Sequence, residues 1–560
     1  MTSLRQLPLE RLYHWEQHAG ERIYLRQAAA GNWRDYTWGQ VADQVRRVTA
    51  FLRHLAFAPG SRVAIYAKNC ADWFIADFSI MMSGHISVPL YATQTADSMR
   101  YVLEHSDTQL VFVGAADSPE NLRRALPDGV HTLAIQGAAI DCDFQLADIL
   151  AQWQPIADNP QPPGDAIFTI MYTSGTTGNP KGVMHDYQTV AHAVPNIVES
   201  FNYTPADRFV SYLPLSHAAE RIVVELQSLY CGASVAFPEG MDTFIDDLKR
   251  ARPTFFFSVP RLWVKFKEAI ETKLPPRLLS LLLSLPGCAG WIKRRVRREL
   301  GLEAARILGT GSAPTAEEVM HWYARLGMPL RDGYGMTENF AYGCMCEEDK
   351  QVPGAVGVPF DDAQVIIGAD DEILFKSPVM MRGYYREPEE TARVLRDGVY
   401  HTGDTGYIDA DGQLHVTGRL SEVFKTTKGK FVKPTRLENF LGECALLGQV
   451  CVFGHGLDQP VLLAGIAEAG RSRPRPELEA QLRQVLAALN DRLETHEAVR
   501  QIFVVAEEWA VENLLLTPTL KLKRRQIEQR YRPWVEQHLH AEQTVIWEVP
   551  AVAGAGTAAA

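Results

Sequence analysis

Residues 166–182 read AIFTIMYTSGTTGNPKG, and this stretch decides how the whole chain is interpreted. Its first part, residues 166–172, is apolar and bounded by polar residues, which predicts a buried strand. A loop rich in glycine and hydroxyl groups follows directly and ends on Lys181; its members are Thr173, Ser174, Gly175, Thr176, Thr177 and Gly178. Glycines let backbone N–H groups converge on one anion, and hydroxyls and a lysine add donors and charge. The stretch therefore predicts a strand that leads into a polyphosphate-binding loop.

Two other interpretations of this loop have to be weighed. Its composition alone also fits an exposed Gly/Ser/Thr linker, but the strand before it and the Lys181-Gly182 pair after it argue against a linker. A Walker A loop is excluded, because Pro180 stands where that motif needs a glycine before the lysine. The phosphate-binding interpretation is kept.

Short apolar runs alternate with helical patterns on both sides of the loop, from about residue 35 to 340. The predicted strands are 62–66, 87–91, 110–113, 166–172, 209–213, 234–237, 255–259 and 306–308. A helical pattern at 38–55 lies between two of them, and a capping box at 315–318 predicts the start of a helix through Ala324. This alternation predicts a large α/β unit with mostly parallel sheets.

The pattern changes after residue 350. Predicted hairpins at 364–376 and 406–416 indicate a β-rich subdomain, and a smaller α+β unit follows Gly418-Arg419. We therefore expect an α/β fold in which residues 1–419 form an N-terminal domain of two parallel α/β subdomains plus the β-rich subdomain. Residues 420–550 are expected to form a small C-terminal domain, and the low-complexity residues 551–560 a flexible tail.

Composition limits the class of protein. Among 560 residues, 46% are hydrophobic and 22% charged, which is ordinary for a globular chain. The net charge of −11 argues against a nucleic-acid partner. Eight scattered cysteines read as reduced thiols, and no signal peptide or long apolar run is visible, so a cytoplasmic location is expected. Cys344 and Cys346 lack a second pair at zinc spacing and are assigned to packing.

Further motifs follow the phosphate loop in the chain. They are YLPLSHAAER at 212–221, GTGSAP at 309–314, DGYGMTE at 332–338, YHTGD at 400–404 with Gly418-Arg419, and LTPTLKLKR at 516–524. Together with the loop these six motifs resemble, in the same order, those of the AMP-forming acyl-CoA synthetases. This family belongs to the adenylating superfamily that includes luciferases and peptide-synthetase adenylation domains. Within the family, the chain is most similar to the long-chain fatty acid–CoA ligase and bubblegum-like branch.

The DGYGMTE motif has its own chemical reason. Small neighbours, Gly333 and Gly335, leave the ring of Tyr334 open for stacking on adenine, although a core tyrosine in a tight turn fits too. Glu338 beside a phosphate loop suits Mg²⁺, which takes one or two carboxylates and keeps most of its waters. A carboxylate at a helix N-terminus is the alternative. The GTGSAP motif is no dinucleotide fingerprint, because Pro314 replaces its third glycine.

The resemblance implies a role for each motif residue. It places Gly311, Ser312 and Ala313 along adenine, and it assigns ATP or AMP binding to Asp332, Gly333, Tyr334, Gly335, Met336 and Thr337. It assigns Asp404 and Arg419 to the ribose and α-phosphate, and Thr176 with Glu338 to Mg²⁺. It also makes His217, Thr337, Glu338 and Lys521 the catalytic group, with ATP contacts from Lys521 as well. Because Thr519-Leu520 replaces the usual Ser-Gly before the lysine, Lys523 remains an alternative to Lys521.

The resemblance implies a two-step reaction with ATP, CoA and Mg²⁺, in which an acid is first adenylated and then transferred to the thiol. It also implies a mobile C-terminal domain that turns about a hinge at Ser421 and brings Lys428, Gly429 and Lys430 to the CoA tunnel. Residues 212–221 and 424–432 resemble the long-chain branch, so a medium- or long-chain fatty acid is the expected substrate. A carrier-protein thiol or another class of acid remains the alternative. A catalytically inactive binding protein is disfavoured, because all five charged site residues are present. They are Lys181, Glu338, Asp404, Arg419 and Lys521.

Residues 278–300 read LLSLLLSLPGCAGWIKRRVRREL. An apolar run followed by a basic one is typical of a segment that lies on a membrane surface. A buried helix followed by an exposed basic helix fits the same pattern, so peripheral membrane contact and a simple helix pair both stay open. The oligomeric state cannot be read from the sequence.

Overall fold

The computed structural model describes residues 6–173, 179–347, 350–442, 444, 446–517 and 521–548. The chain divides into two compact units. Unit 1 comprises Met1–Ile366, Leu374–Thr402 and Asp409–Leu414, and unit 2 comprises Ile367–Ile373, Gly403–Ile408 and His415–Ala560. The predicted boundary at 419/420 stays a prediction, and the predicted tail, 551–560, lies outside the described residues.

An eight-stranded sheet in unit 1 has the order β19-β9-β8-β4-β3-β5-β6-β7. The bounds are β3 Arg62–Tyr66, β4 Ile86–Leu90, β5 Thr108–Val113, β6 His131–Ala134, β7 Phe144–Gln145, β8 Ile167–Thr173, β9 Lys181–Asp186 and β19 Gly383–Tyr384. The strands from β7 to β8 run parallel, whereas β9 is antiparallel to β8, and β19 is antiparallel to β9. The prediction of mostly parallel strands is confirmed for this sheet, in which β9 alone runs in the opposite direction.

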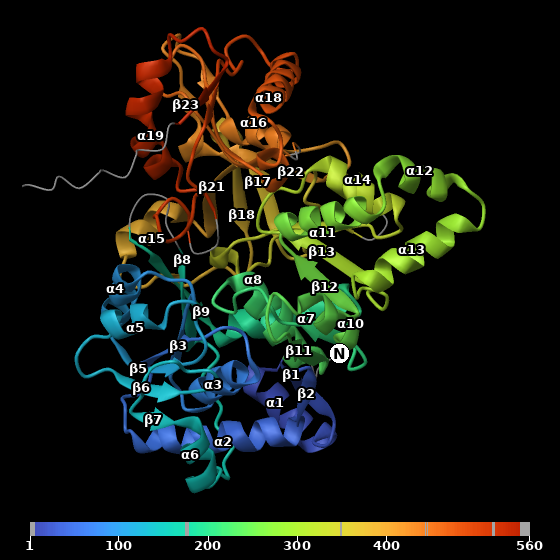
Figure 1. Ribbon diagram of the computed structural model, residues 1–560. Coiled ribbons are helices and arrows are strands. Elements are labelled where there is room, and N and C mark those ends of the chain that lie inside the picture. Colours follow the sequence, from blue (N-terminus) through green and yellow to red (C-terminus); the bar gives the residue numbers. More distant parts are fainter. Residues whose placement is uncertain are drawn as a thin grey trace, which may run out of the picture. The chain divides into compact units, whose positions relative to one another are not determined.

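Helices pack on both faces of this sheet, and the burial of both faces is the reason that its strands are apolar (Figure 1). Val63 and Ile65 of β3 pack into one core cluster with α2 Trp38–His54 and α3 Ala71–Met82. Their neighbours Ala64 and Tyr66 pack into another, with α4 Ala96–Ser106 and α5 Pro119–Ala125. A strand buried on both faces reads as a continuous apolar run, as RVAIY at 62–66 does. The other helices of this part are α1 Pro8–Ala19 and α6 Leu146–Gln152.

Two further sheets complete the first 360 residues. One has the order β10-β11-β1-β2 and the other β12-β13-β14-β15-β16. Their bounds are β1 Ile23–Ala29, β2 Asn32–Thr37, β10 Arg208–Val210, β11 Ser234–Phe237, β12 Phe255–Ser258, β13 Ile307–Gly311, β14 Arg331–Tyr334, β15 Cys344–Met345 and β16 Val358–Pro359. The helical elements among them are α7 Tyr187–Ser200, α8 Ala218–Glu220, the π-helix η1 Arg221–Leu226, α9 Gln227–Cys231, α10 Phe244–Ala251, α11 Pro260–Lys273, α12 Pro276–Ser284, α13 Cys288–Glu299 and α14 Glu317–Arg325.

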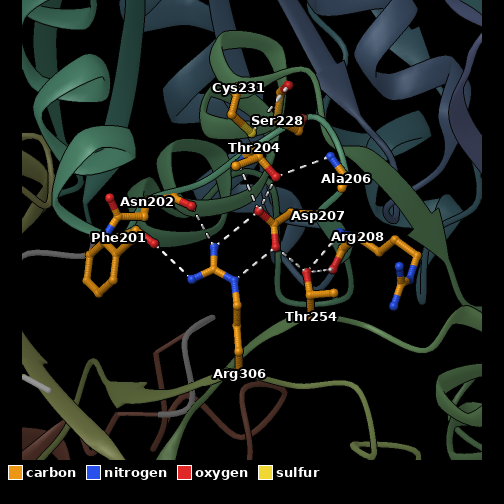
Figure 2. A network of polar contacts seen from close by, with 10 residues as sticks. All are labelled: Phe201, Asn202, Thr204, Ala206, Asp207, Arg208, Ser228, Cys231, Thr254 and Arg306. Carbon is orange, nitrogen blue, oxygen red and sulfur yellow. Dashed lines mark hydrogen bonds and ion pairs between the residues drawn. The ribbon is translucent and has the colours of Figure 1, made fainter.

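A polar network joins the segments between α7 and β13, and Figure 2 shows it. The Arg306 guanidinium forms two bonds of 3.1 Å to the Asp207 carboxylate and donates to the carbonyls of Phe201 and Asn202. Thr254 donates to the same carboxylate at 2.7 Å. Burial alone would raise the pKa of Asp207, but the hydrogen bonds from Arg306 and Thr254 outweigh burial and lower it. The network therefore fixes the entry into β10, β12 and β13, the last of which leads into the GTGSAP motif.

The region from 358 to 419 is built mainly of one sheet, and the remainder of unit 2 combines a second sheet with helices. The strands β17 Gln364–Ile367, β18 Glu372–Lys376, β20 Leu395–Arg396, β21 Val399–Ile408 and β22 Leu414–Arg419 form one sheet, which confirms the two predicted hairpins. In the C-terminal part β25 Leu447–Phe453, β26 Val461–Ile466, β27 Ile502–Val504 and β28 Val545–Trp547 form another. Its faces bury two core clusters, under α16 Pro434–Leu441 and α18 Arg475–Asn490 on one side and α19 Arg524–His538 on the other. This is the small α+β unit that the sequence predicts.

One local prediction is wrong. Thr315 does not cap a helix, because α14 begins at Glu317 and its N-cap residue, Ala316, makes no side-chain cap bond. The Thr315 hydroxyl instead lies 2.9 Å from the Thr310 hydroxyl, inside the protein. A capping box needs the threonine hydroxyl to accept a backbone N–H of the first helical turn, and here that hydroxyl is buried against Thr310 instead, while Glu317 and Glu318 at the helix start are exposed.

Candidate functional site

The GTGSAP and DGYGMTE motifs lie side by side in unit 1. Strands β13 and β14 are parallel, and their register places Gly311 opposite Gly333. Because parallel strands end at the same edge, residues 312–314 and 334–338 emerge together there. Ligands of open α/β sheets bind at this carboxyl edge. The structure thus brings together the residues predicted to bind adenine.

Close packing explains the glycines at this edge. A Cβ on Gly311 would lie 2.8 Å from the Gly333 carbonyl oxygen, and one on Gly335 would lie 2.9 Å from the Ala341 Cα. Ser312 has φ +67°, a left-handed conformation that non-glycine residues adopt rarely and often at functional sites. The ring of Tyr334 faces Phe375 at 5.9 Å between centroids, tilted by 36°. The loop is therefore held in one shape by its backbone.

Asp332 lies beneath this loop rather than at its surface. Only 4% of the residue is exposed, and its carboxylate accepts the N–H of Gly333 at 2.9 Å. Burial raises the pKa of Asp332 to about 7, although a hydrogen bond with Thr315 opposes the shift. The contacts of Asp332 are those of a group that supports the loop from within.

Lys181 is the first residue of β9 and lies opposite Thr173, the last residue of β8. Ser174, Gly175, Thr176, Thr177 and Gly178 lie outside the described residues. The Lys181 ammonium forms an ion pair with Glu390 on α15 Pro388–Val394. The same ammonium lies 5.3 Å from the ring centroid of Tyr384, a cation–π distance.

Glu338 is held by the same tyrosine. It lies on the 3₁₀ turn η2 Thr337–Asn339, and its Oε1 accepts the Tyr384 hydroxyl at 2.9 Å. On the other side of the turn, His185 of β9 lies with its Nε2 2.7 Å from the Thr337 carbonyl oxygen. Burial lowers the pKa of His185 to about 4, so the ring is neutral at pH 7 and Nε2 carries the proton that it donates. Tyr384 therefore contacts both predicted residues: its ring lies beside Lys181, and its hydroxyl binds Glu338.

Tyr384, Glu390 and His185 do not appear among the residues predicted from the sequence. The carboxylate of Glu390 is strongly acidic, because hydrogen bonds from Arg393 and then Lys181 lower its pKa to about 2. These residues stand far from the motifs they contact: 209 positions separate Lys181 from Glu390. Strand pairing of β19 with β9 creates the proximity, and a single sequence carries no signal for it.

His217 caps a short helix. It precedes α8, and its Nδ1 accepts the N–H of Ala219 at 3.2 Å. In this arrangement the neutral ring carries its proton on Nε2. The geometry fixes the orientation of the ring, while its predicted catalytic role stays a prediction.

Asp404 and Arg419, the predicted ribose-binding pair, lie together in unit 2. The guanidinium Nε of Arg419, at the end of β22, is 3.0 Å from Oδ1 of Asp404 on β21. The predicted hinge residue, Ser421, lies on the following 3₁₀ turn, η4 Leu420–Glu422.

The predicted CoA-tunnel residues form the tip of a small hairpin. Lys428, Gly429 and Lys430 connect β23 Phe424–Lys425 to β24 Phe431–Val432, and all three are exposed. Gly429 has φ +76°, which favours glycine, and its N–H donates to the Thr426 carbonyl at 2.9 Å. The tip presents two ammonium groups and the exposed ring of Phe431.

Lys521, the predicted catalytic lysine, is hydrogen-bonded to Thr517. The Lys521 N–H donates to the Thr517 hydroxyl at 3.0 Å, and the Thr517 N–H donates to the Lys521 carbonyl at 2.8 Å. Residues 518–520 lie outside the described residues. Lys521 is exposed, whereas Lys523 is half-buried and burial lowers its pKa. Arg524 binds the Glu438 carboxylate with both Nη atoms, at 2.5 and 2.8 Å.

An apolar cavity of about 40 Å³ lies behind the adenine-loop strands. Its walls include Ile197, Val223, Phe257 and Ile307, with Gln227 and Arg331 as polar members. Phe257 also touches the glycine edge, because a Cβ on Gly311 would lie 3.2 Å from its ring. Gly309, the first residue of the GTGSAP motif, also lines the cavity, so the cavity adjoins this motif directly.

Within the described ranges, no cluster of three or more His, Cys, Asp or Glu side chains could hold a metal ion. Mg²⁺ bound by one carboxylate and substrate phosphates does not need such a cluster, so Glu338 fits that mode of binding. No helix in the described part of the chain has both the length and the apolarity to cross a bilayer.

Comparison with protein-family models gives two matches. Residues 13–385 match the model for AMP-binding enzymes, and residues 422–543 match that for the C-terminal domain of AMP-binding enzymes. Among curated proteins, the chain is 28% identical to the peroxisomal long chain acyl-CoA synthetase 6 of Arabidopsis thaliana, over 92% of this chain and 83% of that protein. It is also 28% identical to the human long-chain-fatty-acid–CoA ligase 1, over 90% and 82%.

Solved structures match across nearly the whole chain. An anthranilate CoA ligase in complex with anthranoyl-AMP has a TM-score of 0.79 at 20% identity and covers 95% of this chain and 98% of its own. The adenylation domain of a carboxylate reductase from Mycobacterium chelonae has a TM-score of 0.79 at 22% identity, over 96% and 93%. At this identity the likeness shows the fold, including the predicted large N-terminal and small C-terminal domains.

Proposed function

The chain belongs to the family of AMP-binding enzymes, and we propose that it is an AMP-forming ligase that joins a medium- or long-chain fatty acid to CoA. The convergence of Lys181 and Glu338 on Tyr384, beside the glycine edge of β13 and β14, carries this proposal. Unit 1 thus contains a cation for the phosphates, Lys181, and a carboxylate for Mg²⁺, Glu338. The edge formed by β13 and β14 would bind adenine. The acyl class rests on the relatives, which are named as long-chain acyl-CoA synthetases.

The first step forms an acyl-adenylate. A carboxylate oxygen of the fatty acid attacks the α-phosphorus of ATP, and the bond to the β-phosphate breaks to release pyrophosphate. In the proposal residues 173–178 and Lys181 hold the β- and γ-phosphates, while Glu338 and Thr176 hold Mg²⁺. Catalysis of this kind consists mainly of positioning and electrostatic stabilisation.

Lys181 has to change partners when ATP binds. Its ammonium is paired with Glu390, so incoming phosphate oxygens compete with that carboxylate. The ring of Tyr384 stays beside the ammonium in either case, and its hydroxyl keeps Glu338 oriented. We assign Tyr384 the role of a positioning residue for both charged groups.

The second step transfers the acyl group. The thiol sulfur attacks the acyl carbon, the bond to the AMP oxygen breaks, and the thiol proton is released. We propose that unit 2 supplies Lys521 to the first step and the exposed tip 428–430 to the second, after rotation about Ser421. Asp404 and Arg419 would bind the ribose of the nucleotide. The exposed position of Lys521, in contrast to half-buried Lys523, supports Lys521 as the catalytic lysine.

The cavity lined by Val223 and Phe257 is the candidate start of the acyl site. It is apolar and adjoins Gly311, but at about 40 Å³ it is far smaller than ordinary ligand pockets of about 300–1,000 Å³. An acyl chain can therefore enter only if the side chains that line the cavity move apart.

Product analysis tests the proposal. The full chain is incubated with ATP, Mg²⁺ and a panel of carboxylic acids, with CoA supplied or withheld, and nucleotides and thioesters are separated chromatographically. We expect AMP, pyrophosphate and acyl-CoA, with fatty acids the best substrates. Formation of ADP and inorganic phosphate would refute the proposal. Acid-dependent AMP release that CoA does not stimulate would point to the alternative, a carrier-protein thiol.

A further inference from the structure

Helices α12 and α13 form a hairpin that extends from the rest of unit 1 (Figure 1). Its inner face is anchored, because Leu279, Ile292 and Val296 are buried in a core cluster with Trp322 of α14. This anchoring makes the hairpin a folded element with a defined outer face.

The outer face is apolar where a water-exposed face is normally polar. Leu278, Leu281, Leu285 and Trp291 are exposed by 45, 56, 42 and 52%. They are four of the eleven large hydrophobic residues exposed in the described part of the chain, and they lie within 14 positions. Such a concentration of exposed apolar side chains marks an interaction site.

The charge of the hairpin is opposite to that of the molecule. Residues 276–298 carry six basic residues and no acidic one, in a chain with net charge −11. In the described residues no carboxylate lies within ion-pair distance of Arg277, Lys293, Arg294 or Arg295. Arg295 lies over the ring of Trp291 at 5.2 Å. The hairpin thus combines exposed apolar side chains with four basic residues that have no carboxylate partner among the described residues, and one of the four, Arg295, lies over an exposed apolar ring.

A hollow of about 310 Å³ lies at the base of the hairpin. It is lined by Ser280, Leu283 and Ser284 of α12, Lys293 of α13 and Arg325 of α14. Arg325 donates to the Ser280 hydroxyl at 3.0 Å, so two of the lining residues are bonded to each other. Lys293 and Arg325 are cationic donors of the kind that a phosphate monoester or diester binds, and the Ser280 hydroxyl, which accepts from Arg325, can add a third donor; the Ser284 hydroxyl already donates to the Leu281 carbonyl at 2.8 Å.

We propose that the α12–α13 hairpin docks on an anionic lipid bilayer and holds a lipid phosphate in this hollow. The leucines and Trp291 enter the interface, where an apolar face flanked by Lys and Arg is stable. The arginines contact the anionic head groups. Because the chain as a whole carries a negative net charge, the basic hairpin is the surface that these head groups attract. Charge complementarity favours this occupant over a second copy of the chain, whose own hairpin is equally basic.

Vesicle flotation of the full chain, without ATP, tests the proposal. We expect binding to vesicles of phosphatidylcholine mixed with phosphatidylglycerol, weakened by salt, and little binding to phosphatidylcholine alone. The double variant Arg294→Gln/Arg295→Gln should bind about 30-fold more weakly. Leu278→Ser/Leu281→Ser/Leu285→Ser should abolish flotation, and Arg325→Gln should weaken it. A matched control, Arg124→Gln/Arg483→Gln, removes two exposed charges elsewhere and should bind normally.

The contradicting results are equally definite. If the unmodified chain does not float, or if the control binds as weakly as the hairpin double variant, the proposal is wrong. A second copy would be the occupant if light scattering shows that the unmodified chain is a dimer, that the triple leucine variant is a monomer, and that neither binds vesicles. Thermal melting and adenylation of a water-soluble short-chain acid verify that each variant is folded. Because flotation is measured without substrates, its outcome is independent of the proposed ligase activity.

Discussion

Tyr384 is the residue on which the charged groups of unit 1 converge. Its hydroxyl binds Glu338, and its ring lies beside the Lys181 ammonium. The sequence predicted Lys181 and Glu338, because glycines, hydroxyls and charges stand in recognisable order around them. It could not predict Tyr384 or Glu390, because β19 and α15 reach β9 only through the tertiary fold. Strand pairing brings Tyr384 and Glu390 to Lys181 from distant positions in the chain, and the residues around Lys181 in the sequence give no sign of that pairing.

Removing the charge of Glu390 should strengthen ATP binding. In Glu390→Gln the Lys181 ammonium no longer has a competing carboxylate, so we expect KM for ATP to fall severalfold. Glu390 has a pKa of about 2 and is ionised at every pH above 4, so the effect should not vary between pH 6 and 9. The neighbouring exposed Glu389→Gln is the control, measured by steady-state kinetics. An increase in KM would mean that Glu390 positions Lys181 for ATP rather than competing with it.

Loss of the Glu338 carboxylate should impair the use of Mg²⁺. For Glu338→Ala we expect kcat/KM to fall by about 10²-fold and the Mg²⁺ concentration at half-maximal rate to rise. Tyr384→Phe keeps the ring beside Lys181 but removes the hydroxyl from Glu338, so a smaller shift in the same direction is expected. Glu318→Gln, an exposed carboxylate on α14, should change neither quantity. Unchanged Mg²⁺ dependence in Glu338→Ala would remove Glu338 from the metal site.

The parallel pair β13 and β14 is the element that carries the predicted adenine-binding residues at one edge. Its two motifs were predicted from their resemblance to those of AMP-forming acyl-CoA synthetases, and the structure adds that Gly311 and Gly333 lie opposite each other on parallel strands. The capping box at Thr315 was wrong, because local spacing cannot show that Thr315 is buried beside Thr310. The antiparallel pair β9 and β19 also escaped prediction, since β19 is two residues long and stands about 200 positions from β9.

Asp332 makes the stability of this element depend on pH. Its pKa is about 7 in the folded chain, above the ordinary value of about 4, because the carboxyl is buried. The fold therefore favours the protonated form, and this contribution to the free energy of unfolding is fully present below pH 4 and lost as pH rises through 7. Asp332→Asn does not titrate, so its melting temperature relative to the unmodified chain should rise between pH 5 and 8. A difference that stays constant over this range would contradict the assignment.

Two units share the predicted site residues. Unit 1 carries Lys181, Glu338 and the adenine edge, and unit 2 carries Asp404, Arg419, the tip 428–430 and Lys521. The match of separate family models to residues 13–385 and 422–543 agrees with this organisation.

Lys521 should be needed for only one half-reaction. One preorganised charge stabiliser contributes about 10²–10³ in rate, so Lys521→Ala should slow adenylation by that factor. The same variant, given synthetic acyl-adenylate and CoA, should form thioester at nearly the normal rate. Lys523→Ala is the control and should spare both steps. Equal loss of both steps in folded Lys521→Ala would refute the two-orientation mechanism, and a selective defect in Lys523→Ala would move the catalytic role to Lys523.

Oxygen transfer tests the acyl-adenylate pathway most directly. When a fatty acid labelled with ¹⁸O in its carboxylate reacts with ATP, the attacking oxygen becomes the bridge between the acyl carbon and the α-phosphorus. Thiol attack on the acyl carbon then leaves that oxygen on the nucleotide. The account predicts that mass spectrometry finds one ¹⁸O in each AMP formed together with acyl-CoA. Unlabelled AMP, or ¹⁸O in inorganic phosphate accompanied by ADP, would contradict it.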